Sequence, residues 1–256
     1  MLLQKAYKIF REDGLREVLE RTKGYIQYRV DSFYFSKIRP VFPMGGETVQ
    51  YNGIVTQPYR IIDPFVPIKL PPNKGGHKLP SEYEHGLSDG LRKNVKSGDD
   101  VVIIGGGIGV TAIIAAQETG PSGSVVVYEG AENMVKFIQE TIRLNDVPCP
   151  IDIRHSVVGS DKGLHGQPGG ASHVSINEIP ECDVLEMDCE GAEAEILESM
   201  DNRPRCIIVE THRNRSQVET LLRGAGYHIL SGNVAEVGPY ESRCKEHEIF
   251  VLTASI

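Results

Sequence analysis

From residue 82 onward, short runs of apolar residues alternate with segments in which apolar residues recur every three or four positions. The short runs are typical of buried strands, and the longer periodic segments are typical of helices that bury one face. Glycine, proline or paired polar residues separate most of them, as at Gly120-Pro121. Strands are expected at residues 100–106, 124–129, 151–159, 182–188 and 205–212. Helices are expected at residues 81–95, 109–119, 133–146, 191–200 and 217–226.

Strands that alternate with helices form a parallel sheet covered by helices on both faces. Two further strands are expected at residues 226–233 and 247–254, with no helical pattern between them. Without a crossover helix this last pair should be antiparallel. The pattern therefore predicts an α/β fold, a doubly wound, Rossmann-like and mostly parallel sheet with an antiparallel C-terminal hairpin.

The first 80 residues differ from the rest of the chain. Residues 1–38 combine apolar residues at helical spacing with many Lys and Arg, and Asp13-Gly14 divides them into two short amphipathic helices. Residues 39–80 are rich in Pro and Gly, and within them Asn52-Gly53 predicts the turn of a short β element at 51–63. We therefore expect an N-terminal helical and Pro-rich extension at 1–80 and a separate α/β domain at 81–256.

Composition narrows the class of protein. The chain has 27 basic and 35 acidic residues, a net charge of −8, which argues against a nucleic acid as main partner. No apolar run is long enough to span a bilayer, and the N-terminus lacks the features of a signal peptide. The five cysteines form no CxxC pair and are expected to be reduced, buried thiols. These features predict a soluble, cytoplasmic protein.

The first expected strand runs into a glycine-rich turn, with glycines at 105, 107 and 109. Such a turn lets a ligand approach the backbone, and the helix that follows offers free N–H groups. A dinucleotide fingerprint would need a glycine at Val110, so the spacing favours S-adenosylmethionine over NAD. Glu129 ends the next strand and can accept hydrogen bonds from both ribose hydroxyls, in either cofactor. The antiparallel C-terminal hairpin also argues against NAD.

Acidic residues cluster where the fourth and fifth expected strands end. Asp188 and Glu190 should face the cleft at the carboxyl ends of the strands, and Glu210 and His212 should lie on the same rim. Less specific interpretations stay open for individual residues of this set. Glu193 could only stabilise the start of the next helix through the helix dipole. Glu186 could be a solvated contact at the edge of the sheet, and His212 could be an ordinary loop histidine.

Several segments together resemble the FkbM family of class I S-adenosylmethionine-dependent methyltransferases. They are VVIIGGGIGVTA, VVVYEGAENM, VVGS, DVLEMDCEGAEAEIL, IIVETH and the GYHIL…HEIFVL ending, over about residues 82–252. MDCEGAE followed by VETH is the most specific part. The chain departs from the family at Ile103, where an Asp is usual. The resemblance implies cofactor contacts from Gly105, Gly107, Gly109, Glu129, Val158, Asp188 and Glu84.

The resemblance implies methyl transfer from the sulfonium to an acceptor oxygen, aligned by the protein. A hydroxyl acceptor needs a base, for which Asp188 or His212 are the candidates, with Glu190 and Glu210 orienting the acceptor. His212 is attractive because the reference pKa of histidine is near 6.5. No metal site is predicted, because the spacing is not diagnostic, although the same carboxylates could bind Mg²⁺.

The resemblance also implies a small-molecule or glycan acceptor, such as a hydroxyl of a glycan, glycolipid or natural product. A uronic carboxylate would need no base. The basic helices of residues 1–38 could contact the inner membrane surface peripherally, or form a cap or a homodimer contact. An NAD-linked oxidoreductase and a catalytically silent cofactor-binding module, prompted by Ile103, remain the alternatives.

Overall fold

The computed structural model describes Arg11 and residues 48–57, 81–160 and 169–256. The amphipathic helices expected in residues 1–38, and most of the Pro-rich stretch, lie outside these residues. Residues 48–57 and 79–256 form one compact unit.

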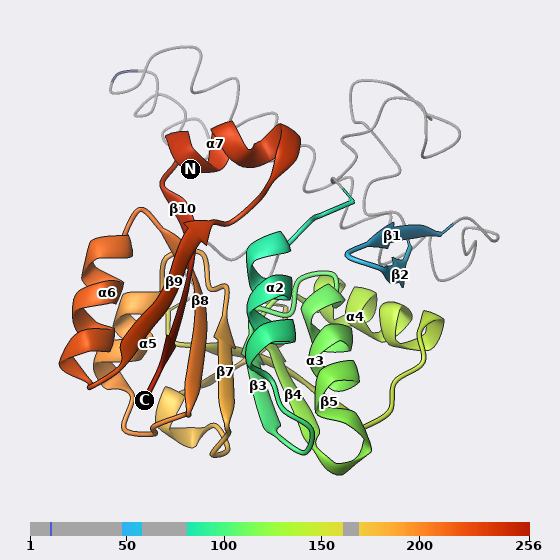
Figure 1. Cartoon of the computed structure of the whole chain (residues 1–256). Coiled ribbons are helices and arrows are strands. Elements are labelled where there is room, and N and C mark those ends of the chain that lie inside the picture. Colours follow the sequence, from blue (N-terminus) through green and yellow to red (C-terminus); the bar gives the residue numbers. More distant parts are fainter. Residues whose placement is uncertain (1–10, 12–47, 58–80, 161–168) are drawn as a thin grey trace. The chain divides into compact units, whose positions relative to one another are not determined.

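An eight-stranded sheet is the centre of the unit (Figure 1), with the strand order β6-β5-β4-β3-β7-β8-β10-β9. All neighbouring strands from β6 to β8 are parallel, and β10 is antiparallel to both β8 and β9. The strands are β3 (Asp100–Ile104), β4 (Ser124–Glu129), β5 (Ile151–Val158), β6 (Ser172–Val174), β7 (Val184–Met187), β8 (Cys206–His212), β9 (His228–Val234) and β10 (Ile249–Ser255).

Helices cover both faces of the sheet (Figure 1). Residues of α5 and α6 pack with Leu185, Ile207 and Val209 in the core on one face. On the other face α2 contacts α3 and β8, and α3 contacts α4. The helices are α2 (His85–Asn94), α3 (Val110–Thr119), α4 (Glu132–Leu144), α5 (Glu193–Ser199), α6 (Arg215–Gly224) and α7 (Glu241–Glu246).

The predicted fold class is confirmed by this topology. β3 and β4 are almost continuously apolar because both of their faces are covered by helices. The turn after β3 therefore lies at the carboxyl edge of the parallel strands, where β7 and β8 also end. This edge carries the candidate site.

The structure corrects three details of the expected elements. A six-residue helix, α7, lies between the last two strands, where none was expected, yet β9 and β10 are antiparallel as predicted. The short edge strand β6 was not expected. The helix predicted from residue 81 begins at His85, so Glu84 precedes the helix and does not lie within it.

The predicted Asn52-Gly53 turn joins strands β1 (Val49–Tyr51) and β2 (Ile54–Thr56). Both turn residues have positive φ, at 49° and 84°, which favours this dipeptide at the tip of a hairpin. Asn145 holds the hairpin to the end of α4, because its side chain accepts from the Val55 N–H and donates to the Val55 carbonyl. The hairpin thus belongs to the same unit as the sheet.

All five cysteines are free, as expected. Cys149, Cys206 and Cys244 are buried, but Cys182 and Cys189 are only half-buried, which corrects the expectation that all would be buried.

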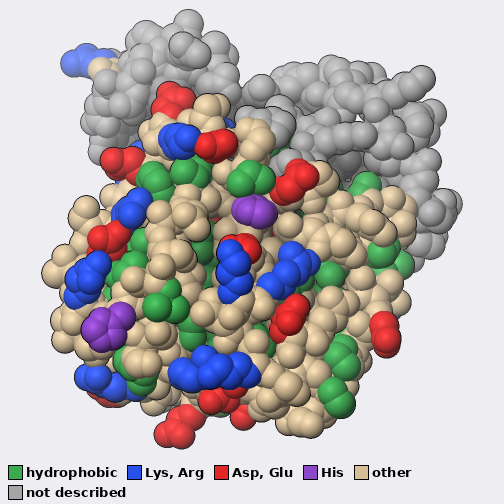
Figure 2. Space-filling model, in the orientation of Figure 1, with side chains coloured by type: hydrophobic (Ala, Val, Ile, Leu, Met, Phe, Trp, Pro, Cys, Tyr) green, Lys and Arg blue, Asp and Glu red, His purple; other side chains and the backbone are tan. Residues whose placement is uncertain are grey.

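Among the described residues, no helix is both long and apolar enough to cross a membrane. Figure 2 shows one face of the molecule, where basic and acidic side chains are interspersed over the described surface.

Candidate functional site

The glycine-rich turn is packed so closely that its first glycine cannot carry a side chain. Gly105 has φ +95°, and a Cβ atom there would lie 2.0 Å from the Asp188 carbonyl oxygen. The Gly105 N–H donates to the Tyr128 carbonyl at 2.9 Å, and the Asp188 N–H donates to the Ile104 carbonyl at 2.9 Å. The turn after β3 is therefore fixed between the ends of β4 and β7.

Glu129 ends β4 and binds this turn. Its Oε2 accepts from the Gly107 N–H at 3.0 Å and its Oε1 accepts from the Ala131 N–H at 2.7 Å. The side chain is buried, and burial raises the pKa of Glu129 to about 7, although these backbone hydrogen bonds oppose the shift. Each carboxylate oxygen retains a further lone pair for another donor.

A second group of acids lies at the ends of β7 and β8. Side chains alternate along a strand, and since the odd-numbered residues of β8 pack in the α5 and α6 core, Glu210 and His212 point to the opposite face. Glu186 and Asp188 are placed in the same way on β7. The structure thus brings Asp188, Glu210 and His212 together from two adjacent strands.

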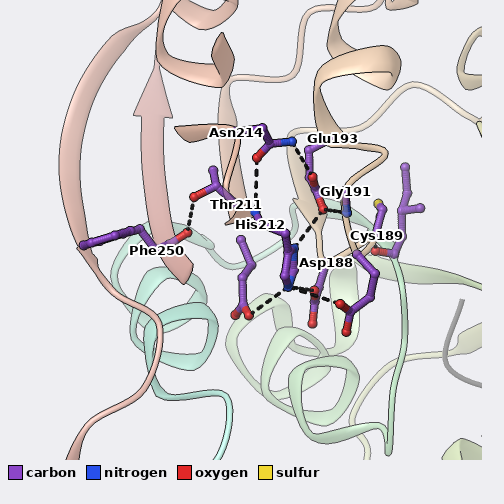
Figure 3. A network of polar contacts seen from close by, with 11 residues as sticks. Asp188, Cys189, Gly191, Glu193, Thr211, His212, Asn214 and Phe250 are labelled. Carbon is purple, nitrogen blue, oxygen red and sulfur yellow. Dashed lines mark hydrogen bonds and ion pairs between the residues drawn. The ribbon is translucent and has the colours of Figure 1, made fainter. Parts of the chain in front are cut away.

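His212 is the centre of this group (Figure 3). Its Nε2 lies 3.4 Å from Glu190 Oε2, 3.5 Å from Glu210 Oε1 and 3.7 Å from Asp188 Oδ1. Its Nδ1 lies 3.2 Å from Glu193 Oε1. Four carboxylates therefore surround one imidazole.

This environment changes the acid–base behaviour expected of His212. Burial disfavours the charged ring, but the Glu193 hydrogen bond and the charges of Asp188 and Glu190 raise the pKa of His212 to about 9. The reference value near 6.5 does not apply, and the imidazole is protonated at neutral pH in the ion-free site. Burial raises the pKa of Asp188 to about 7 while His212 opposes the shift. Asp188 is therefore better suited than His212 to accept a proton there.

Glu193 is part of the site as well as the first residue of α5. It is fully buried, and it accepts hydrogen bonds from the Gly191 N–H at 2.8 Å and from Asn214 Nδ2 at 2.9 Å. Burial raises its pKa, but the hydrogen bonds from His212, Gly191 and Asn214 outweigh burial, so the pKa of Glu193 is lowered. Glu193 is thus an ionised carboxylate that orients the imidazole.

Glu186 is not the solvated edge contact that the sequence left open. The residue is fully buried, and neither carboxylate oxygen has a hydrogen-bond partner among the described residues. Burial, followed by the charges of Asp188 and Glu84, raises the pKa of Glu186 well above its usual range.

Glu84 reaches the glycine-rich turn from the start of α2. Its Oε1 would lie 3.1 Å from a Cβ atom on Gly107, so the carboxylate flanks this glycine. The Glu84 N–H donates to Glu236 Oε1 at 2.8 Å, which ties the start of α2 to the segment after β9. Burial, and then the charges of Asp188 and Glu236, raise the pKa of Glu84 well above its usual range.

The backbone around the site is strained. Among the described residues, five non-glycine residues have positive φ. Two of them, Glu84 at 59° and Glu190 at 54°, are candidate site residues, and Arg213 at 64° follows His212. Such conformations cost free energy and persist where the surrounding structure imposes them, which is common at functional sites.

The candidate residues form two adjacent groups. Gly105, Gly107, Glu129 and Glu84 lie at the turn after β3, and the other acids surround His212. Gly109 precedes α3, where its Cβ atom would lie 3.2 Å from the Ile138 backbone. Val158 ends β5 and packs in the core with Ile196, so it is the candidate with the most ordinary structural role.

The sequence did not identify Asn214 and Glu236 as site residues. Asn214 lies directly before α6 and fixes Glu193, and its Oδ1 also accepts from the His212 N–H at 3.1 Å. An Asn before a helix is a common capping pattern, which is a weak signal for such a role. Glu236 has no sequence signal of this kind, because its contact with Glu84 spans 152 residues.

Comparisons with known proteins give structural neighbours only. No family model and no curated protein matches the chain. A ribosomal protein L11 methylase from Lactobacillus delbrueckii subsp. bulgaricus is 15% identical, over 67% of this chain and 77% of that one, with a TM-score of 0.47. A precorrin-6y C5,15-methyltransferase from Geobacter metallireducens GS-15 is 15% identical, over 72% and 93%, with a TM-score of 0.46. Aeropyrum pernix fibrillarin, with natively bound S-adenosyl-L-methionine, is 17% identical, over 63% and 68%, with a TM-score of 0.43.

Proposed function

We propose that this protein is an S-adenosylmethionine-dependent methyltransferase that transfers a methyl group to an acceptor oxygen. The observation that carries the proposal is the position of Glu129. Its carboxylate is held by the Gly107 and Ala131 N–H groups at the carboxyl ends of β3 and β4. In doubly wound folds this is the edge where a nucleoside ligand binds, with an acid on its ribose.

The turn after β3 suits a cofactor without a pyrophosphate. Val110, where a dinucleotide fingerprint would have glycine, is the first residue of α3 and is fully buried. Glu84 flanks Gly107 with a buried carboxylate, and its Oε2 has no hydrogen-bond partner among the described residues. A buried acid in this state favours a cationic ligand group. The ammonium of the methionine part of the cofactor is such a group.

The proposed chemistry is an in-line displacement. The acceptor oxygen forms a bond to the methyl carbon as the bond from that carbon to sulfur breaks. Sulfur keeps the electron pair and becomes a neutral thioether, and the hydroxyl proton moves to Asp188. The protein aligns donor and acceptor, while the buried acids near the sulfonium favour its positive charge before transfer.

For the acceptor, the resemblance to the FkbM family supports a hydroxyl, or a uronic carboxylate, of a glycan, glycolipid or natural product. The half-buried carboxylates of Glu190 and Glu210 could accept hydrogen bonds from neighbouring hydroxyls of such a molecule.

Calorimetric titration of the full chain with S-adenosylhomocysteine, and separately with NADH, tests the cofactor. We expect saturable binding of S-adenosylhomocysteine only. Glu129→Gln should weaken it about 10-fold or more, because the amide places an N–H donor against donors of the backbone and ribose. Glu132→Gln is the matched control, since Glu132 is exposed and forms an ion pair with Lys136 in α4.

Tight binding of NADH would overturn the cofactor assignment in favour of an oxidoreductase. Saturable S-adenosylhomocysteine binding that Glu129→Gln leaves unchanged would contradict the assigned site. Methyl transfer from labelled cofactor to a panel of glycans then tests the reaction. Transfer to a glycan hydroxyl would exclude the alternative of a silent binding module.

A further inference from the structure

We propose that Asp188, Glu190 and His212 bind a divalent transition-metal ion on the acceptor side of the proposed cofactor site. Each of these residues offers one possible ligand atom, and the three atoms lie within 4.8 Å of one another. Among the described residues, this is the one group of His, Cys, Asp and Glu side chains that is close enough to share a metal ion. Binding of the ion is independent of the proposed function, but its catalytic role rests on that function.

The spacing of the ligand atoms fits a shared ion. Two atoms that each lie about 2.1 Å from one ion at tetrahedral angles are roughly 3.4 Å apart. Nε2 of His212 is 3.4 Å from Glu190 Oε2 and 3.7 Å from Asp188 Oδ1. These distances are long for hydrogen bonds, and one N–H cannot serve both acceptors well. Glu210 Oε1 lies 3.5 Å from the same nitrogen but does not belong to this group of three.

His212 is oriented as a metal ligand usually is. The buried Glu193 carboxylate lies 3.2 Å from Nδ1, which leaves Nε2 directed at the other carboxylates (Figure 3). A carboxylate on the far nitrogen of a coordinating histidine fixes the ring and raises its basicity. Asn214 and the Gly191 N–H hold Glu193 in this position.

A buried acid oxygen without a hydrogen-bond partner points independently to a bound cation. Asp188 Oδ1 is itself buried and has no hydrogen-bond partner among the described residues. Asp188, Glu190 and Glu210 all lie within 3.7 Å of the same imidazole nitrogen. Buried carboxylates in such proximity must be neutralised by protons or by a cation.

The donor set selects the ion. Carboxylates alone would suit Mg²⁺ or Ca²⁺, whereas an imidazole nitrogen among them favours Mn²⁺, Fe²⁺ or Zn²⁺. In the proposed reaction, the ion would bind the acceptor hydroxyl and lower its pKa. Asp188 would then be a ligand with Glu190 instead of the base, and Glu210, which also lies beside His212, would take the proton.

Titration of the EDTA-treated full chain with Mn²⁺, followed by electron paramagnetic resonance, tests the site without the organic cofactor. We expect one bound Mn²⁺ per chain and weaker binding of Mg²⁺. Asp188→Asn, Glu190→Gln and His212→Gln should each abolish this site. Glu193→Gln should weaken it about 10- to 100-fold, as loss of an outer-shell carboxylate does.

Glu195→Gln and His228→Gln are the matched controls, because both residues are exposed and lie outside the group. Circular dichroism checks that each variant is folded. Glu190→Gln is the variant least disruptive to packing, since the Glu190 side chain is 31% exposed.

Absence of a Mn²⁺ site in the wild-type protein would overturn the proposal. Binding that survives Glu190→Gln and His212→Gln in folded protein, or that prefers Mg²⁺, would overturn it equally. A different result, no binding of S-adenosylhomocysteine by the wild-type protein, would contradict the proposed function. His212→Gln should remove the ion and retain S-adenosylhomocysteine, whereas Glu129→Gln should retain the ion.

Discussion

The turn after β3 and the acidic group around His212 are adjacent, yet their carboxylates have different partners. Glu129 receives both of its hydrogen bonds from backbone N–H groups, which the chain fixes when β3, β4 and α4 form. Asp188, Glu190 and Glu210 instead face one imidazole nitrogen, at 3.4–3.7 Å. Glu129 is thus held by the backbone, whereas the acids around His212 are held mainly beside another side chain.

This difference separates two kinds of preorganisation. Backbone donors cost little to hold in place, so the Glu129 carboxylate is ready for a neutral ligand such as a ribose. The acids around His212 repel one another, and the fold holds them together through packing and a strained backbone at Glu190. A positively charged partner that binds there is expected to offset this repulsion.

The largest effect is expected where the two regions touch. In Gly105→Ala the new Cβ atom would overlap the Asp188 carbonyl, and a non-glycine residue would adopt φ +95°. We expect the free energy of unfolding, measured with urea, to fall by about 3 kcal/mol or more. Gly191→Ala is the control, because it also has positive φ, at +107°, but nothing lies within 4 Å of its Cβ position. Equal losses in the two variants would contradict the close contact.

A second expected effect is an unusual dependence of stability on pH in the EDTA-treated protein. The pKa values of Glu129, Asp188 and Glu236 are raised to about 7, first of all by burial, so the folded state binds more protons than the unfolded state between about pH 4.5 and 7. The stability that they contribute is therefore present at low pH and is lost as the pH rises. The raised pKa of His212, about 9, extends this loss to higher pH.

Urea denaturation at a series of pH values should show stability falling between pH 5 and 9. Each of the three acids contributes up to about 1.4 kcal/mol per pH unit, so the steepest fall, below pH 7, should be about 3–4 kcal/mol per pH unit. Saturating Mn²⁺ should reduce the fall, because it replaces protons in the group around His212. Glu195→Gln should leave the slope unchanged, as Glu195 is exposed. Stability that rises over this range would contradict the assignment of raised pKa values.

The smallest effect is expected at the edge of the second region. Asn214→Ala removes the donor to Glu193 Oε2 and the acceptor of the His212 N–H. We expect a loss of about 1–2 kcal/mol in the free energy of unfolding, because one buried carboxylate oxygen loses its partner. Asn177→Ala is a control with an equally polar but exposed side chain, which contacts Asp201. A shift of the His212 ring resonances in the NMR spectrum only in Asn214→Ala would show that Asn214 acts on the imidazole.

The order of strands and helices in residues 81–256 could be predicted because buried parallel strands and amphipathic helices leave different apolar periods in the sequence. The glycine-rich turn and Glu129 could be assigned in the same way, since both follow directly from strand ends. Short elements such as β6 and α7 were missed, because three to six residues carry too little pattern.

The sequence by itself determined the layered fold, the turn after β3 and the set of acids at the strand ends, since these depend on residues close together in the chain. Only the tertiary structure decided how the acids meet. Glu84 lies 104 positions before Asp188 along the chain, and Glu236 lies 152 positions after Glu84. Their burial, and the raised pKa of His212, depend on charges from separate strands that become neighbours only when the sheet forms. No local pattern encodes that electrostatic environment, because it arises from through-space interactions in a region from which water is excluded.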